Sequence, residues 1–137
     1  MVKFGNFEVE YNRNAPDKVS VRIETDDKGE VWLPKCDIAR AYGVFVQSVN
    51  AGLKSLAKTG DFDEYRDVRV EHFTYNGKDC SVDLYSLETI IALGFRMKGL
   101  KCEAFRKWAA RRLAESFEKK KSTVIICMSG EKRYNWN

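Results

Sequence analysis

Residues 33–58, LPKCDIARAYGVFVQSVNAGLKSLAK, constrain the fold more than any other stretch of this chain. Pro34 suits the first position of a helix, because the N–H that proline lacks has no partner there. Apolar residues recur at helical spacing on both sides of Gly43, and glycine tolerates the positive φ of a sharp turn. The apolar face of the second segment consists of Val46, Val49, Leu53 and Leu56. The pattern predicts two short helices joined by a tight turn, which is a helix-turn-helix.

The outward face predicted for the second helix is polar and carries no acidic residue. It consists of Gln47, Ser48, Asn50, Ala51 and Lys54. Such side chains can contact base edges from a helix in the major groove, and we expect Gln47 and Asn50 to do so. Lys35, Lys54 and Lys58 would instead lie over phosphates. A helical hairpin that only packs into a core has the same glycine and apolar seam, so this alternative stays open.

Residues 1–33 alternate apolar and polar side chains, as half-buried strands do. We expect strands at 7–11, 19–23 and 30–33, with residues 12–18 as a turn region. Residues 26–29, DDKG, are a strong turn signal and would join the last two strands into an antiparallel hairpin. Trp32 is expected in the core.

A second hairpin is predicted at 68–85, because Asn76 and Gly77 separate two alternating segments. A hairpin that follows a helix-turn-helix is called a wing. Its tip presents Tyr75, Asn76 and Lys78, which we expect to contact a phosphate backbone or a minor groove.

Two helices are predicted after this hairpin. Ser86 is a good N-cap for the first, which would end near Gly94. A basic connection follows, whose Arg96, Lys98 and Lys101 are further expected DNA contacts. The second helix runs from Cys102 to about residue 120 with an aromatic stripe on one face.

The predicted fold class is therefore α+β. Residues 1–121 form a winged helix-turn-helix domain, with strands in 1–33, the helix-turn-helix at 34–58, the wing at 68–85 and two helices at 86–120. Residues 122–137 form a C-terminal strand, at 124–128, and a tail.

Charge is unevenly distributed along the chain, whose net charge is +4. Residues 34–60 hold four basic and one acidic residue, net +3, and residues 94–121 hold ten and three, net +7. Residues 61–93 hold three basic and eight acidic residues, net −5. Clusters of positive charge are expected of a phosphate-binding surface, although basic residues on a long helix also serve as its solvated face.

Other classes of protein fit the sequence poorly. It has no nucleophile-elbow, phosphate-loop or HExxH motif, a single histidine, and four cysteines without a C-x-x-C pair. We therefore expect no catalytic residues, no metal site and no cofactor. No apolar run approaches the ~18 to 20 residues that span a bilayer. We expect a protein of the reducing cytoplasm that does not enter the membrane.

The stretch YSLETIIALGFR at 85–96, followed by FRKWA at 105–109, resembles the virulence RhuM family. Leu33, Pro34 and Lys35 resemble the start of the family's LTKKQMAELFGV segment, and GDFDE at 60–64 its EGELDE segment. The resemblance covers about residues 20–115. It implies a bacterial, often prophage- or island-associated DNA-binding protein of the phage antirepressor type. The chain departs from the family pattern at Lys98, Gly99 and Leu100, where members are rich in Asn and Ser, and in lacking the second domain of longer members.

Three functional hypotheses follow. The first is a transcriptional regulator that binds double-stranded DNA, and we expect it to be a homodimer through its C-terminal region. The second is an antirepressor-like module that binds another regulator protein. The third is a metal-dependent nuclease, for which the acidic residues Asp61, Asp63 and Glu64 are the candidates.

Overall fold

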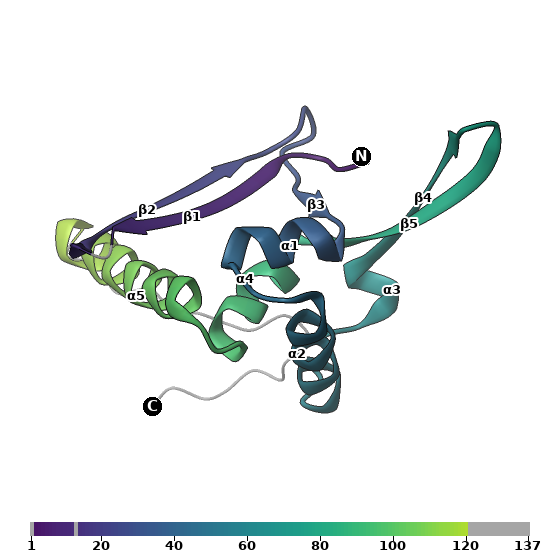
Figure 1. Cartoon of the computed structure of the whole chain (residues 1–137). Helices are drawn as coiled ribbons and strands as arrows, with labels where there is room; N and C mark the ends of the chain where they lie inside the picture. Colours follow the sequence, from purple (N-terminus) through teal and green to yellow (C-terminus); the bar gives the residue numbers. More distant parts are fainter. Residues whose placement is uncertain (1, 13, 121–137) are drawn as a thin grey trace.

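The computed structural model of the chain describes residues 2–12 and 14–120, and within them the fold is α+β, as predicted (Figure 1). This part of the chain has two small antiparallel sheets and five helices, and both sheets and all helices but α3 contribute to one hydrophobic core. The elements are β1 (Asn6–Asn12), β2 (Ala15–Glu24), β3 (Trp32–Leu33), α1 (Lys35–Tyr42), α2 (Val46–Lys58), α3 (Glu64–Asp67), β4 (Val68–Tyr75), β5 (Lys78–Ser86), α4 (Leu87–Arg96) and α5 (Leu100–Lys120). None of these helices is long and apolar enough to cross a lipid bilayer.

The N-terminal hairpin pairs β1 with β2, in the register Phe7↔Ile23 and Val9↔Val21. The prediction that residues 19–23 pair with 30–33 is wrong. The turn at 26–29 does form, because the Asp26 side chain accepts the N–H groups of Lys28 and Glu30 at 3.0 and 2.8 Å. Beyond this turn, however, the chain leaves β2 and pairs with β5. Strand β2 also begins at Ala15, inside the region predicted as a turn.

The second sheet has the strand order β3-β5-β4. Trp32 pairs with Ser86 at one edge, and β4 and β5 pair from Val68↔Tyr85 to Tyr75↔Lys78. The predicted hairpin is confirmed, and Asn76 and Gly77 at its tip both have positive φ, 52° and 75°. Trp32 is only half-buried, contrary to the prediction. Its indole N–H donates to Glu30 at 2.9 Å, so the polar edge of the ring stays near the surface.

The helix pair is inserted between β3 and β4, with the predicted turn at Gly43. This residue is left-handed, with φ 63°, and its N–H donates to the Arg40 carbonyl at 3.2 Å. Helix α2 turns Val49, Gly52, Leu53 and Leu56 inward. Val46 was predicted on this apolar face but is 38% exposed, because the first turn of α2 extends past the core.

The last two helices run longer than predicted. Ser86 caps α4 by accepting the Thr89 N–H at 3.3 Å, but the helix continues through Gly94 to Arg96. Helix α5 packs Phe105 and Trp108 against the rest of the core, whereas Leu113, further along the helix, is 53% exposed. The strand predicted at 124–128 and the tail to residue 137 lie outside the described residues.

Gly94 has a packing role that explains why a glycine is placed inside a helix. A β-carbon at this position would lie 2.6 Å from the Tyr42 hydroxyl oxygen and 2.6 Å from Cδ2 of the Phe105 ring. Both neighbours are large, buried side chains, so neither can move away easily.

We therefore expect Gly94→Ala to lower the free energy of unfolding by about 1–2 kcal/mol, because overpacking costs more than the ~0.5–1 kcal/mol that alanine gains in a helix. Urea denaturation measures the change. The control is Ala51→Gly at an exposed position of α2, which should cost only the ~0.5–1 kcal/mol of helix propensity. A variant Gly94→Ala as stable as the parent would contradict the close approach of α4 to α1 and α5.

Candidate nucleic-acid interface

The outer face of α2 is polar to basic and free of acidic side chains. Gln47, Ala51, Lys54 and Lys58 follow one another at helical spacing, and all four are exposed. The sequence of α2 contains no Asp or Glu. This face therefore presents lysines and an amide to solvent without a carboxylate from its own helix.

Residues from the end of α4 flank α2 on one side. Arg96 donates to Ser55 Oγ at 3.0 Å, to Thr59 Oγ1 at 3.1 Å and to Asp61 Oδ2 at 3.3 Å. The structure thus ties this predicted phosphate contact to the C-terminal end of α2 and partly neutralises it with Asp61. Lys98, two residues further along the chain, is exposed and lines a shallow hollow together with Ser48.

Lys101 lies next to the turn between α1 and α2. A β-carbon on Gly43 would be 3.5 Å from Cδ of Lys101, so the methylene groups of this lysine cover the turn. Lys98 and Lys101 are far from α2 in the sequence, but the fold places Lys98 beside α2 and Lys101 beside the turn that precedes it.

On its other side α2 forms a groove with the β4–β5 hairpin. Lys35 and Lys54 line the groove on the helical side, and Glu64 and Asp83 also line it. The Lys35 ammonium lies 5.8 Å from the centre of the Tyr85 ring, a cation–π contact. Positive and negative groups are therefore mixed here, unlike on the outer face of α2.

Asn50 does not lie on the exposed face, and this prediction is wrong. Its side chain is half-buried in the groove, and its Oδ1 atom is buried and accepts no hydrogen bond from the described residues. The inward side chains Val49 and Leu53 set the rotation of α2, and this rotation carries Asn50 toward the hairpin. Ser48 is half-buried too, on the opposite side of the helix. Gln47 remains the exposed amide of α2.

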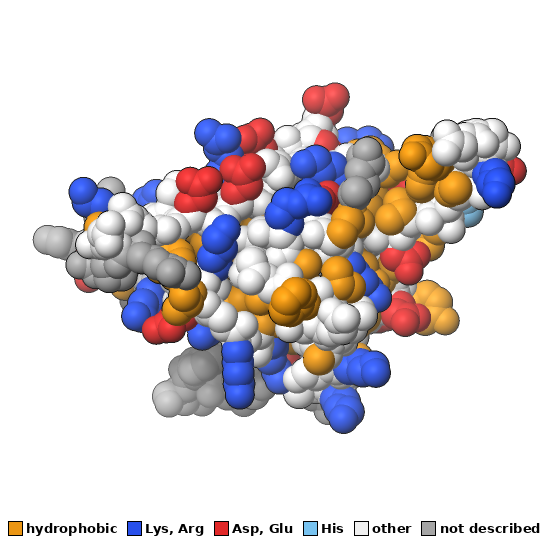
Figure 2. All heavy atoms as spheres, in the orientation of Figure 1, with side chains coloured by type: hydrophobic (Ala, Val, Ile, Leu, Met, Phe, Trp, Pro, Cys, Tyr) orange, Lys and Arg blue, Asp and Glu red, His pale blue; other side chains and the backbone are white. Residues whose placement is uncertain are grey.

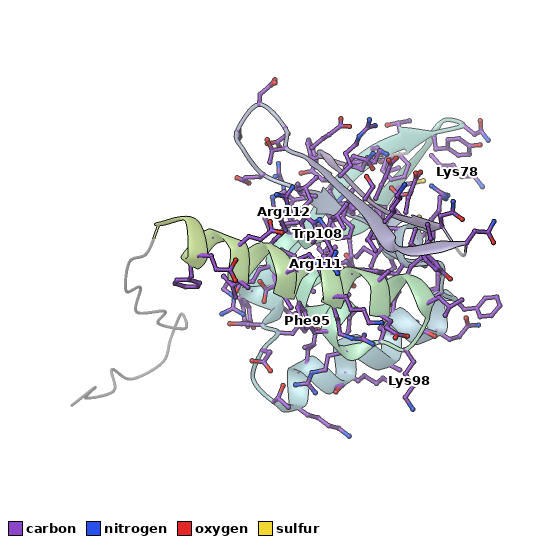
Figure 3. The ribbon with its side chains drawn as sticks, turned by 90° about the vertical axis from the view of Figure 1, so that its left-hand side faces the viewer. Lys78, Phe95, Lys98, Trp108, Arg111 and Arg112 are labelled. Carbon is purple, nitrogen blue, oxygen red and sulfur yellow. The ribbon has the colours of Figure 1, made fainter. Side chains whose placement is uncertain are left out.

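The hairpin tip and the end of α4 lie far apart in the fold, the tip at the upper right of Figure 1 and the α4–α5 connection to the left of α2. Lys78 and Lys98 both extend toward one edge in Figure 3, the hairpin above and the end of α4 below. Tyr75 beside the tip is 65% exposed, and Asn76 and Lys78 are exposed as well. A ligand that contacts α2, the α4–α5 connection and the hairpin tip would therefore have to be extended.

Among the described residues, the basic side chains of 94–118 do not form one patch. Arg106 donates to the carbonyls of Gly94 and Met97, each at 3.0 Å, and so closes the end of α4. Arg111 and Arg112 lie along α5, away from Lys98, with the Arg112 guanidinium 5.9 Å from the Trp108 ring (Figure 3). Only the N-terminal part of this basic segment adjoins α2.

Asp67 fixes the base of the hairpin and was not among the residues predicted from the sequence. Its carboxylate is 1% exposed and accepts hydrogen bonds from Arg66 at 2.8 Å, the Asp63 N–H at 3.0 Å and the Ser86 hydroxyl at 3.1 Å. Burial alone would raise the pKa of Asp67, but these hydrogen bonds and the Arg66 charge outweigh it and lower the pKa. An acidic residue in a polar stretch gave no sign of this burial.

Because its pKa is lowered on folding, the Asp67 carboxylate stabilises the fold above the unfolded value of about 4, and this stabilisation is lost as pH falls through the lowered pKa. We expect Asp67→Asn to reduce the free energy of unfolding by ~1.5–3 kcal/mol at pH 7, the range for hydrogen bonds to a charged group. The deficit relative to the parent should shrink below about pH 4. Urea titrations between pH 3 and pH 7 test this, with Asp27→Asn, at an exposed turn position, as the control. A deficit that is constant with pH would contradict an ionised Asp67.

Two of the three acidic residues suggested for a nuclease have partners within the structure. Asp61 is bound to Arg96, and Asp63 caps α3 by accepting the Tyr65 N–H at 3.0 Å. Among the described residues, no three Asp, Glu, His or Cys side chains come together as a metal site.

Comparisons of the chain with protein-family models, with curated proteins and with solved structures give no match.

Proposed function

We propose that this protein binds double-stranded DNA through a winged helix-turn-helix and acts as a transcriptional regulator of the RhuM or antirepressor type. The observation on which this proposal rests is the outer face of α2, which has no carboxylate and has lysines on both sides. Lys35 and Lys54 lie toward the hairpin, and Lys98 lies toward α4. Phosphate binding needs positive charge on both sides of a helix that enters a groove.

The dimensions and topology agree with this role. Helix α2 has 13 residues and is therefore about 20 Å long, and a helix fits the ~12 Å wide major groove. The helix pair is inserted between an edge strand and a hairpin of the same sheet, which is the order expected of a helix-turn-helix with a wing. In this pose Gln47 faces base edges, Lys54, Lys58 and Lys98 face phosphates, and the tip residues Asn76 and Lys78 contact the adjacent backbone.

The competing proposal is a module that binds another regulator protein. The β4–β5 hairpin supports it, because Glu71, Asp79 and Asp83 outnumber Arg69 and Lys78 there. Val70 is also 51% exposed on the groove side of the hairpin. An acidic and apolar surface suits a protein better than it suits a phosphate backbone.

Salt dependence of DNA binding separates the two proposals. We expect a fluorescent random-sequence duplex of about 30 base pairs to bind in the micromolar range, more weakly as salt rises from ~50 to ~200 mM. Lys54→Ala and Lys98→Ala should each reduce the slope of log K against log salt by about 0.9, because each removes one phosphate contact. Fluorescence anisotropy measures both quantities.

The matched control is Arg111→Ala, which removes one positive charge from the part of α5 that lies away from α2 and should leave the slope unchanged. Equal effects of all three substitutions would mean that only net charge matters. Binding without salt dependence, or no binding, would favour the protein-binding module. Cleavage of the duplex after addition of Mg²⁺ would favour the nuclease.

A further inference from the structure

Phe45 is a large apolar side chain held in solvent at the start of α2. It is 81% exposed, and Val46 beside it is 38% exposed. The backbone of Phe45 caps the helix, with φ −80° and ψ 155°, and its carbonyl accepts the Ser48 N–H at 3.0 Å. The side chain makes no capping hydrogen bond.

The fold gains little from a phenylalanine at this position. Ser, Thr, Asp and Asn stabilise a helix as N-caps by about 1 kcal/mol relative to apolar residues. Single exposed apolar residues are common on proteins and need no special explanation. Phe45 differs from such residues in its position, because it is the N-cap of the proposed recognition helix and follows the turn that Lys101 covers.

The segment that lies against the turn before Phe45 carries a lysine, Lys101. A β-carbon on Gly43 would lie 3.5 Å from Cδ of Lys101, and a β-carbon on Gly99 would lie 3.5 Å from Cγ1 of Val44. The turn before Phe45 is therefore packed against the α4–α5 connection. Figure 2 shows apolar side chains over the start of α2, bordered mostly by uncharged surface with Lys and Arg side chains beyond it, while acidic side chains lie toward the β1–β2 hairpin and α3. An apolar group with basic side chains beyond it fits a ligand that is anionic outside and has apolar groups within.

We propose that Phe45 contacts the C5-methyl groups of thymine in the major groove and so makes the protein selective for sites that contain thymine. This inference rests on the proposed function. The N-terminal residues of a recognition helix are those that reach base edges, and the thymine methyl is the apolar group that the major groove displays. The phosphates on either side of it would lie against Lys98 and Lys54.

The experiment uses duplexes that differ only in this methyl group. A random library is enriched on the full-length protein, and the enriched duplex is resynthesised with deoxyuridine in place of thymidine, one position at a time. Uracil pairs with adenine in the same way but lacks the methyl group. At the contacted positions, the parent protein should bind the deoxyuridine duplex about fourfold more weakly, the ratio that corresponds to one buried methyl group at ~0.8 kcal/mol.

Phe45→Ala should abolish this ratio and leave the salt slope unchanged, because no charge is removed. Phe45→Leu should retain part of the ratio, and it keeps the test valid if the alanine variant folds poorly. The control is Leu113→Ala, an equally apolar change at an exposed site of α5, which should preserve the fourfold ratio.

The outcomes separate the two proposals. If no duplex is enriched and binding shows no salt dependence, the proposed function and this inference both fail. If DNA binds with the expected salt slope but thymine and uracil duplexes bind equally, or if Phe45→Ala keeps their ratio, the proposed function stands and the role of Phe45 is overturned.

Discussion

The buried side chain of Tyr42 determines how the helices of this protein are arranged. Its hydroxyl donates to the Ile90 carbonyl of α4 at 2.7 Å, and its ring lies 5.4 Å from Phe7 and 5.7 Å from Phe105. One residue thus joins α1 to α4, α5 and β1. Burial, and then the neighbouring Cys102, raise the pKa of Tyr42, so the hydroxyl keeps its proton and remains a donor. The absence of a side chain at Gly94 is what lets this hydroxyl approach α4.

The same interaction positions the proposed DNA-binding surface. Gly43 follows Tyr42 directly and turns the chain, so the start of α2 at Val46 is fixed only four residues after Tyr42. Val44 then lies against Gly99, which holds the α4–α5 connection beside α2. Lys98 and Lys101 are consequently placed by backbone packing, and no ion pair with α2 is needed to keep them there. A rigid core can in this way preorganise flexible lysines for phosphates.

Turn and cap residues in the sequence predicted most helices and strands of this fold, but the pairing of strands far apart in the sequence could not be predicted. Gly43, Ser86 and the Asn76–Gly77 turn each act through their own backbone, so their sequence is sufficient. Strand β3 has two residues and pairs with β5, more than fifty residues away, and nothing in its sequence identifies that partner. For the candidate site, the types of residue on α2 were predictable, but its rotation depends on how Gly52 approaches Leu93. This rotation places Asn50 in the groove. Counting charges along the chain likewise could not show that Arg106 binds the end of α4 whereas Lys98 is exposed.

The distribution of carboxylates assigns different roles to the two ends of the proposed interface. In a DNA complex, α2 meets phosphates without an acidic residue of its own, whereas the hairpin carries Glu71, Asp79 and Asp83. Strands rise about 3.4 Å per residue, so Asp83, opposite Val70, lies roughly 17 Å from the tip, beyond the ~8 Å Debye length at physiological salt. Asp79, adjacent to Lys78, is the carboxylate close enough to weaken a phosphate contact at the tip. The net electrostatic attraction there is therefore small, and affinity must come mainly from α2 and the α4–α5 connection. In the proposed complex, the hairpin would therefore orient the protein on DNA and contribute little to its affinity.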